Sequence, residues 1–150
     1  MEITIGILGF IVVIVAVEYF FFSKRKGEKE DKEEEQIDPI EVRFKATQKL
    51  SEEVQLDIEN YILKADAADK PLFKDMTFSE YLAHLKETHS ENLSDSLYER
   101  LSKLELTKSN SVFIIKSLEF QFSALLQIKN KMQVLDLLYS KRLTLSKGQN

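Results

Sequence analysis

The C-terminal stretch at residues 111–145, SVFIIKSLEFQFSALLQIKNKMQVLDLLYSKRLTL, decides the fold. It contains neither proline nor glycine, the two residues that most disfavour a helix interior. We therefore expect one continuous helix about 50 Å long. Apolar residues recur in it at alternating three- and four-residue steps, a pattern typical of a coiled-coil seam. The seam comprises Ile115, Leu118, Phe122, Leu125, Lys129 and Met132.

The two halves of this helix differ in composition. The first half is apolar on nearly all sides, which predicts that it lies at the centre of a helical bundle. Besides the seam, it carries Val112, Phe113, Ile114, Phe120, Leu126 and Ile128. The second half is more amphipathic and more basic, and we expect it to extend beyond the bundle.

The second half also supplies the predicted partner-binding surface, formed by its apolar and basic positions. These are Met132, Leu135, Leu138, Tyr139, Lys141 and Arg142. For the four apolar positions, ordinary core packing is the alternative, because they recur at helical spacing. For the two basic positions, the alternatives are contact with anionic lipid headgroups and plain solvation near a helix C-terminus.

Shorter helices are expected before this long one. Pro39 fits the first turn of one helix, and Pro71 ends it. The tetrapeptide from Thr77 to Glu80 matches the capping box of a second helix, and Ser90 is a candidate cap for a third. No segment shows the sustained alternation of a strand. We therefore predict an all-α bundle of about four helices with a long C-terminal helix.

Residues 1–22 predict a single transmembrane helix. Of the twenty residues at 3–22, fourteen are Ile, Leu, Phe or Val, and a helix of that length spans about 30 Å of bilayer. No basic residue precedes the apolar run and no small-residue cleavage site follows it, so we expect an uncleaved anchor instead of a signal peptide. Because Lys24, Arg25 and Lys26 directly follow it, the positive-inside rule places the N-terminus outside and the remaining chain in the cytoplasm.

The predicted span in the plasma (inner) membrane carries candidate packing residues. Its small-residue face would let another helix come close, although coincidence is the alternative. That face is formed by Gly6, Gly9, Val13 and Ala16. Glu18 either contacts another span or reaches the headgroup layer, where Lys24, Arg25 and Lys26 are predicted to bind anionic lipid.

A charged juxtamembrane linker at 23–38 follows the span. From Ser23 to Gln36 it has five basic and six acidic residues and no apolar one, so it cannot form a core. As a flexible tether it would hold the helical domain at 39–150 within about 20 Å of the membrane.

Several kinds of chemistry are excluded or disfavoured. The chain has no cysteine, and residues 28–147 contain no glycine, so a phosphate-binding loop and a cysteine-based metal site are both out. Five residues separate His84 from His89, which is the wrong spacing for a metal pair, and neither has a recognisable acid partner. The pI of about 5.3 argues against nucleic acid as a partner.

One short motif offers an alternative function. Residues 83–88, AHLKET, resemble the phospho-accepting helix of histidine kinases and phosphotransfer domains. The resemblance implies that His84 accepts a phosphoryl group in a membrane-tethered signalling chain. Otherwise His84 is a surface histidine one helical turn from Glu80.

The sequence as a whole predicts a non-enzymatic membrane scaffold or an accessory subunit of a larger membrane assembly. Such an assembly would be a secretion, motility, division or transport machine. The expected partners are other proteins of the complex, anionic lipid headgroups and a second copy of the chain. We expect no catalytic residue, cofactor, bound metal or small-molecule substrate. A further alternative is a self-associating membrane-active protein that acts through its span.

Overall fold

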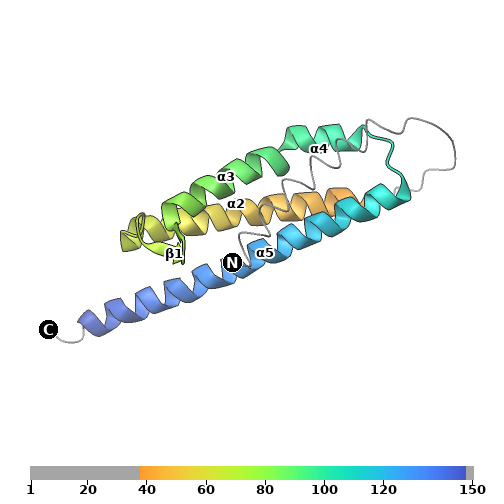
Figure 1. Ribbon diagram of the computed structural model, residues 1–150. Helices are drawn as coiled ribbons and strands as arrows, with labels where there is room; N and C mark the ends of the chain where they lie inside the picture. The colour runs from red at the N-terminus through yellow and green to blue at the C-terminus, as the bar shows by residue number, and fades with distance from the viewer. Residues whose placement is uncertain (1–37, 148–150) are drawn as a thin grey trace. The chain divides into compact units, whose positions relative to one another are not determined.

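The computed structural model describes residues 38–147, and they are mostly helical. The predicted transmembrane anchor at 1–22 and the linker, apart from its last residue, lie outside the described residues. The elements in chain order are α2 (Pro39–Ala65), β1 (Pro71–Phe73), β2 (Met76–Thr77), α3 (Phe78–Asn92), α4 (Asp95–Ser102) and α5 (Lys108–Lys147) (Figure 1).

The helices pack as three rods. α2 lies between the other two, and α3 and α4 run back along one side of it, roughly end to end (Figure 1). α5 runs parallel to α2, because Arg43 near the start of α2 contacts Glu119 and Lys64 near its end contacts Asp136. Residues 38–147 thus form three shorter helices and one long apolar C-terminal helix, and the predicted four-helix bundle is not confirmed.

Local signals at the helix ends explain where α2 begins and stops. Asp38 caps the N-terminus, its Oδ1 accepting a hydrogen bond of 2.9 Å from the backbone N–H of Ile40. Pro39 occupies the first turn as predicted. At the other end Asp66 adopts a left-handed conformation with φ of 47°, which ends the helix before Pro71.

A short β-hairpin, which the all-α prediction omitted, joins α2 to α3. β1 pairs antiparallel with β2, and the two strands are too short to show an alternating pattern in the sequence. Leu72 of β1 is buried, and its carbonyl oxygen accepts a hydrogen bond of 2.6 Å from Lys131 Nζ of α5. The hairpin therefore closes one end of the core.

The predicted cap of α3 is confirmed and that of α4 is wrong. Thr77 and Glu80 form the capping box. α3 continues through Ser90 to Asn92, so Ser90 is an interior residue. The cap of α4 is Ser94, whose Oγ accepts a hydrogen bond of 3.3 Å from the backbone N–H of Leu97.

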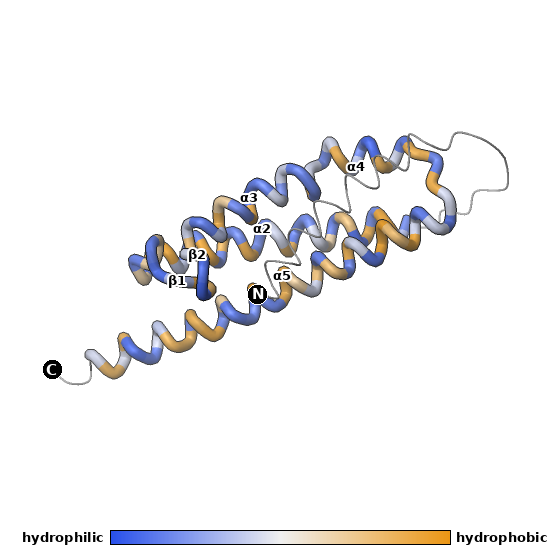
Figure 2. Tube along the Cα trace, in the orientation of Figure 1, coloured by the Kyte–Doolittle hydropathy of each residue, from blue (hydrophilic) through white to orange (hydrophobic). Residues whose placement is uncertain are grey.

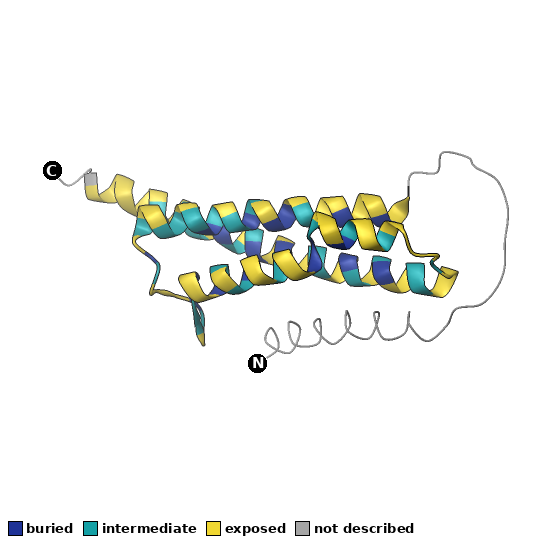
Figure 3. Ribbon diagram, turned by 90° about the horizontal axis from the view of Figure 1, so that it is seen from above, coloured by how far each residue is buried: buried dark blue, intermediate teal, exposed yellow. Residues whose placement is uncertain are grey.

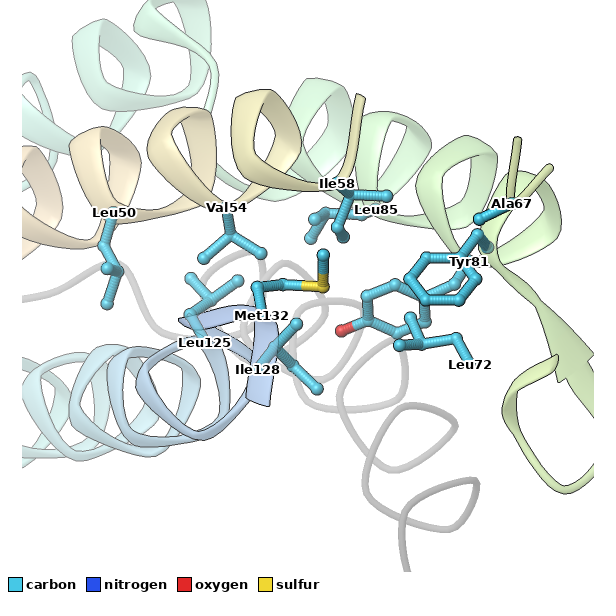
Figure 4. Packing of buried hydrophobic residues seen from close by; sticks show 11 residues of the cluster. Leu50, Val54, Ile58, Ala67, Leu72, Tyr81, Leu85, Leu125, Ile128 and Met132 are labelled. Carbon is cyan, nitrogen blue, oxygen red and sulfur yellow. The ribbon is translucent and has the colours of Figure 1, made fainter. Parts of the chain in front are cut away.

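The core consists of two clusters along the three rods. The larger joins α2, β1, α3 and α5, with side chains of α5 pointing at those of α2 and α3 (Figure 4). Its buried members are Leu50, Val54, Ile58, Ala67, Leu72, Phe78, Tyr81, Leu85, Leu125, Ile128 and Met132. The smaller lies at the α4 end and comprises Ile40, Phe44, Leu93, Leu97, Ile114 and Leu118.

α5 confirms part of its predicted pattern and contradicts the rest. The seam residues Leu118, Leu125 and Met132 are buried, as the heptad spacing predicted. The first half does not lie at the centre of a bundle, because α5 contacts the other rods on one side only. Phe113 and Phe120 are consequently exposed.

The second half of α5 extends past the other rods, as predicted, and residues 140–146 are exposed on all sides (Figure 3). Apolar residues recur along the whole helix (Figure 2). Lys108–Ser146 is long and apolar enough to cross a membrane by length and composition, and 22% of its most apolar window is buried. One side of it packs against α2 and α3 and contributes Leu125, Ile128 and Met132 to the larger core cluster.

Candidate protein-binding surface on the C-terminal helix

α5 has a second apolar stripe that faces away from the core. We call it the outer face and define it by Phe113, Phe120, Val134, Leu138 and Leu145, which are 44%, 59%, 55%, 56% and 65% exposed. Steps of seven and four residues return to nearly the same side of a helix. Leu118 of the core and Phe120 are two residues apart, so they point in nearly opposite directions.

Further exposed apolar residues border the outer face. They are Val112, Leu126 and Leu137. Scattered exposed leucines are normal on a protein surface, whereas a contiguous apolar row along one helix marks an interaction site. Two of the five defining residues are phenylalanines, an aromatic type that is enriched in protein interfaces.

The charges around the outer face are of one sign. α5 has two acidic residues, Glu119 and Asp136, and both pair with α2. Glu119 lies 3.2 Å from Arg43. Lys116, Lys141 and Arg142 are exposed instead. The outer face therefore combines apolar side chains with basic ones and no unpaired carboxylate.

The six predicted partner-binding residues do not lie together. Leu138, Lys141 and Arg142 are exposed, as a binding role requires. Met132 is only 2% exposed in the core, and Leu135 packs against the same cluster. Both follow the alternative of core packing, because they fall on the side of α5 that faces α2 and α3.

Tyr139 also faces the bundle. Its hydroxyl donates a hydrogen bond to the backbone carbonyl of Lys64 at the end of α2. Its ring lies edge-on to Tyr61 at a centroid distance of 6.3 Å, and Lys64 Nζ lies 5.9 Å from the centroid of the ring. This residue therefore fastens α5 to α2 and is not free for a partner.

The lysine in the heptad seam is accommodated by an ion pair. Lys129 is half-buried and its Nζ pairs with a carboxylate oxygen of Glu53 on α2. The hydrogen bond and the charge of Lys129 lower the pKa of the Glu53 carboxyl below its ordinary value. Asp57, one turn further along α2, has a raised pKa because burial disfavours its charged form.

A polar cluster between α2 and α3 is the second candidate site. Ser51 Oγ is 3.0 Å from Nδ1 of His89, and Nε2 of the same ring is 3.8 Å from Oε1 of Glu52. Serine, histidine and carboxylate are the groups of a hydrolytic triad. Ser51, however, is fully buried inside the bundle, where no substrate reaches its hydroxyl. The cluster links two helices, and it supplies His89 with the acid neighbour that the sequence did not reveal.

The candidate phosphoacceptor His84 is half-buried on α3. Glu80 does not pair with it, because its Oε2 accepts hydrogen bonds of 2.8 and 2.9 Å from the backbone N–H and the hydroxyl of Thr77. Within residues 38–147 no hydrogen bond or ion pair holds the ring of His84. Over the same range no group of three or more histidine, aspartate and glutamate side chains could hold a metal ion.

Sequence reasoning missed Phe113 and Phe120 because it placed the first half of α5 in the core. The available signal was the spacing of Phe113, Phe120 and Val134, seven and then fourteen residues apart, which forms a stripe separate from the seam. The predicted membrane residues lie outside the described part of the chain. They are Gly6, Gly9, Val13, Ala16, Glu18, Lys24, Arg25 and Lys26. No protein-family model matches this chain, and neither a curated protein nor a solved structure shows significant similarity to it.

Proposed function

We propose that this protein is a single-pass membrane scaffold or accessory subunit whose cytoplasmic helical domain binds another protein through the outer face of α5. The observation that carries the proposal is the exposed apolar row from Phe113 to Leu145 on a helix whose opposite side builds the core. Leaving five large apolar side chains in water forgoes the free energy of their burial, which a bound protein would supply.

The apolar N-terminal sequence supplies the membrane part of the proposal. Anchored at 1–22 and tethered by 23–38, the domain would move in two dimensions close to other membrane components. Such confinement raises its effective concentration toward them without any new contact. A modest binding surface is then sufficient for a stable assembly.

The first experiment tests membrane attachment. We expect the full chain to remain in the membrane fraction after carbonate washing, and protease added from outside to leave residues 39–150 intact. Recovery of the intact chain in the soluble supernatant would overturn the anchor. Digestion of the helical domain from outside would overturn the cytoplasmic orientation.

The second experiment tests the binding surface. The tagged full chain is recovered in mild detergent, alongside a Phe120→Asp/Leu138→Asp variant and a matched Leu63→Asp control. Leu63 is 82% exposed on α2, so its substitution adds a charge of the same sign away from the outer face. We expect the unaltered chain and the control to retain a protein partner that the double variant loses. Equal recovery of that partner by all three would refute the outer face as the site.

A further inference from the structure

We propose that the partner seated on the outer face of α5 is a second copy of this chain, with the two α5 helices antiparallel. The inference rests on the proposed function in one respect, namely that the outer face binds protein. It adds which protein binds and in which register.

The first argument is the symmetry of the outer face. Phe113 and Leu145 are equally far in sequence from Lys129, and so are Phe120 and Leu138. An antiparallel pair of helices centred at that position therefore sets Phe113 against Leu145 of the second copy. It sets Phe120 against Leu138 in the same way, and the two-fold axis repeats both contacts. Each large aromatic ring meets a leucine.

The centre of the stripe obeys the same symmetry. Ala124 and Val134 are also equally far from Lys129, which places a small side chain opposite a β-branched one. Next to the axis, Gln127 is level with Lys131 of the second copy, whose ammonium group donates to the Leu72 carbonyl within its own copy and so brings no unpaired charge to the axis. Polar residues at the centre with apolar residues at both ends give a self-complementary row.

The second argument is size. The stripe from Phe113 to Leu145 is about 48 Å long. Its five exposed apolar residues are spread over that whole length, so a helix of the second copy can lie against the row from end to end.

The third argument is charge. In a parallel pair, Lys141 and Arg142 would each lie beside their counterparts at the same end. In the antiparallel pair these basic residues are at opposite ends, which leaves Lys116 as the cation near Lys141 of the second copy. Since salt screens that remaining repulsion, we expect pairing to strengthen with ionic strength. Binding of an acidic protein or an anionic bilayer would weaken instead.

The absence of cysteine from the sequence makes the register directly measurable. A Phe120→Cys/Leu138→Cys variant of the full chain is oxidised in mild detergent and run on a non-reducing gel. The two positions are about 27 Å apart along one helix, so any disulfide joins two copies. The matched control is Phe113→Cys/Leu138→Cys, which has two cysteines on the same face in the wrong register.

We expect a covalent dimer from the Phe120/Leu138 pair, at least tenfold more than from the control and more at high salt. Helicity measured by circular dichroism verifies that each variant is folded. Absence of dimer in both variants overturns self-pairing, and equal amounts of dimer in both overturn the antiparallel register. Dimer formation by Phe120→Cys alone overturns the antiparallel register, because it requires a parallel pair.

Failure here is distinguishable from failure of the proposed function. If no copy-to-copy disulfide forms but Phe120→Asp/Leu138→Asp still loses a different protein, the outer face is a binding site for that protein and self-pairing is wrong. If vesicles with 30% phosphatidylserine bind the full chain less tightly after the same substitutions, while no disulfide forms, the face binds lipid and the self-pairing proposal is likewise wrong.

Discussion

The inner and outer faces of α5 are alike in sequence and opposite in environment. Both are rows of large apolar side chains that recur along the same helix. Leu118, Leu125 and Met132 on the inner face are buried, while Phe120 and Leu138 on the outer face are more than half exposed. The difference comes from the number of neighbours. α2 and α3–α4 cover one side of α5, and within residues 38–147 no element covers the other.

This comparison shows what a heptad pattern contains. The pattern identifies stripes on a helix but does not say which stripe meets the rest of its own chain. α5 has two such stripes, one for the bundle and one that stays free. Substitutions on each face test that division.

The largest effect is expected from Met132→Ala. Removing a buried side chain from the cluster that also contains Val54 and Ile58 (Figure 4) leaves a cavity, which costs about 2–5 kcal/mol of unfolding free energy. Leu138→Ala on the outer face should change it by less than about 0.5 kcal/mol. Thermal unfolding of the full chain in mild detergent, followed by circular dichroism, measures both. If both variants lost a similar amount of unfolding free energy, the two faces would not differ in their contribution to stability.

Substitutions on the outer face should lower the affinity for the partner and leave the stability of the fold unchanged. Phe120→Ala removes an exposed aromatic side chain from the proposed interface, where aromatic residues are frequent hot spots. We expect affinity for the partner to fall at least tenfold, or about 1.4 kcal/mol, with an unchanged unfolding temperature. Titration in detergent with labelled chain measures the affinity. If Phe120→Ala lowered the unfolding temperature and left the affinity unaltered, Phe120 would stabilise the fold and would not belong to the binding surface.

Substitution of Tyr139 tests whether this residue belongs to the inner face of α5 or to the binding surface. Tyr139→Phe removes the hydroxyl that donates to the Lys64 carbonyl, so we expect a loss of about 1 kcal/mol of stability and no loss of partner binding. Tyr61→Phe is the matched control, because within residues 38–147 the hydroxyl of Tyr61 has no hydrogen bond. Should Tyr139→Phe weaken partner binding as well, the original assignment of this residue to the binding surface would be restored.

The smallest effect concerns the ion pair in the seam. Lys129 lowers the pKa of Glu53 in the folded state. The ion pair therefore stabilises the fold above the ordinary carboxyl pKa, and this stabilisation is lost as pH falls through the lowered pKa. Glu53→Gln should flatten the acid loss of stability below about pH 4.5. The pKa of Asp57 is raised, so its carboxyl takes up a proton more readily in the folded state and opposes the loss of stability in acid. Asp57→Asn should therefore make the loss of stability with falling pH slightly steeper. Unfolding midpoints measured from pH 3 to 7 test both signs.

Much of the fold was predictable because it depends on local signals. The proline at the start of α2, the capping box at Thr77 and the continuous helix of α5 all follow from residues near one another in the chain. The extension of α3 past Ser90 was not predictable from local signals. Ser90 and Ser94 are equivalent cap residues, and the packing of Leu93 determines which of them is used. The hairpin was missed because five residues are too few for a periodic pattern.

Only part of the candidate site could be predicted, because the side of α5 that is buried depends on contacts with residues far away in the sequence. Leu138, Lys141 and Arg142 were assigned to the surface from the amphipathic second half. The roles of Met132 and Phe120 depend on which side of α5 meets α2, a helix more than forty residues earlier in the chain. That orientation is a property of packing, and the local sequence of α5 is compatible with either side.

The order of α2 and α5 in the chain has a consequence for biosynthesis. Leu50, Val54 and Ile58 of α2 are covered by Leu125, Ile128 and Met132 (Figure 4), which leave the ribosome after them. Until then the nascent chain exposes the apolar side of α2, and such surfaces attract chaperones or aggregate. A premature stop just before residue 125 would make that vulnerable state permanent.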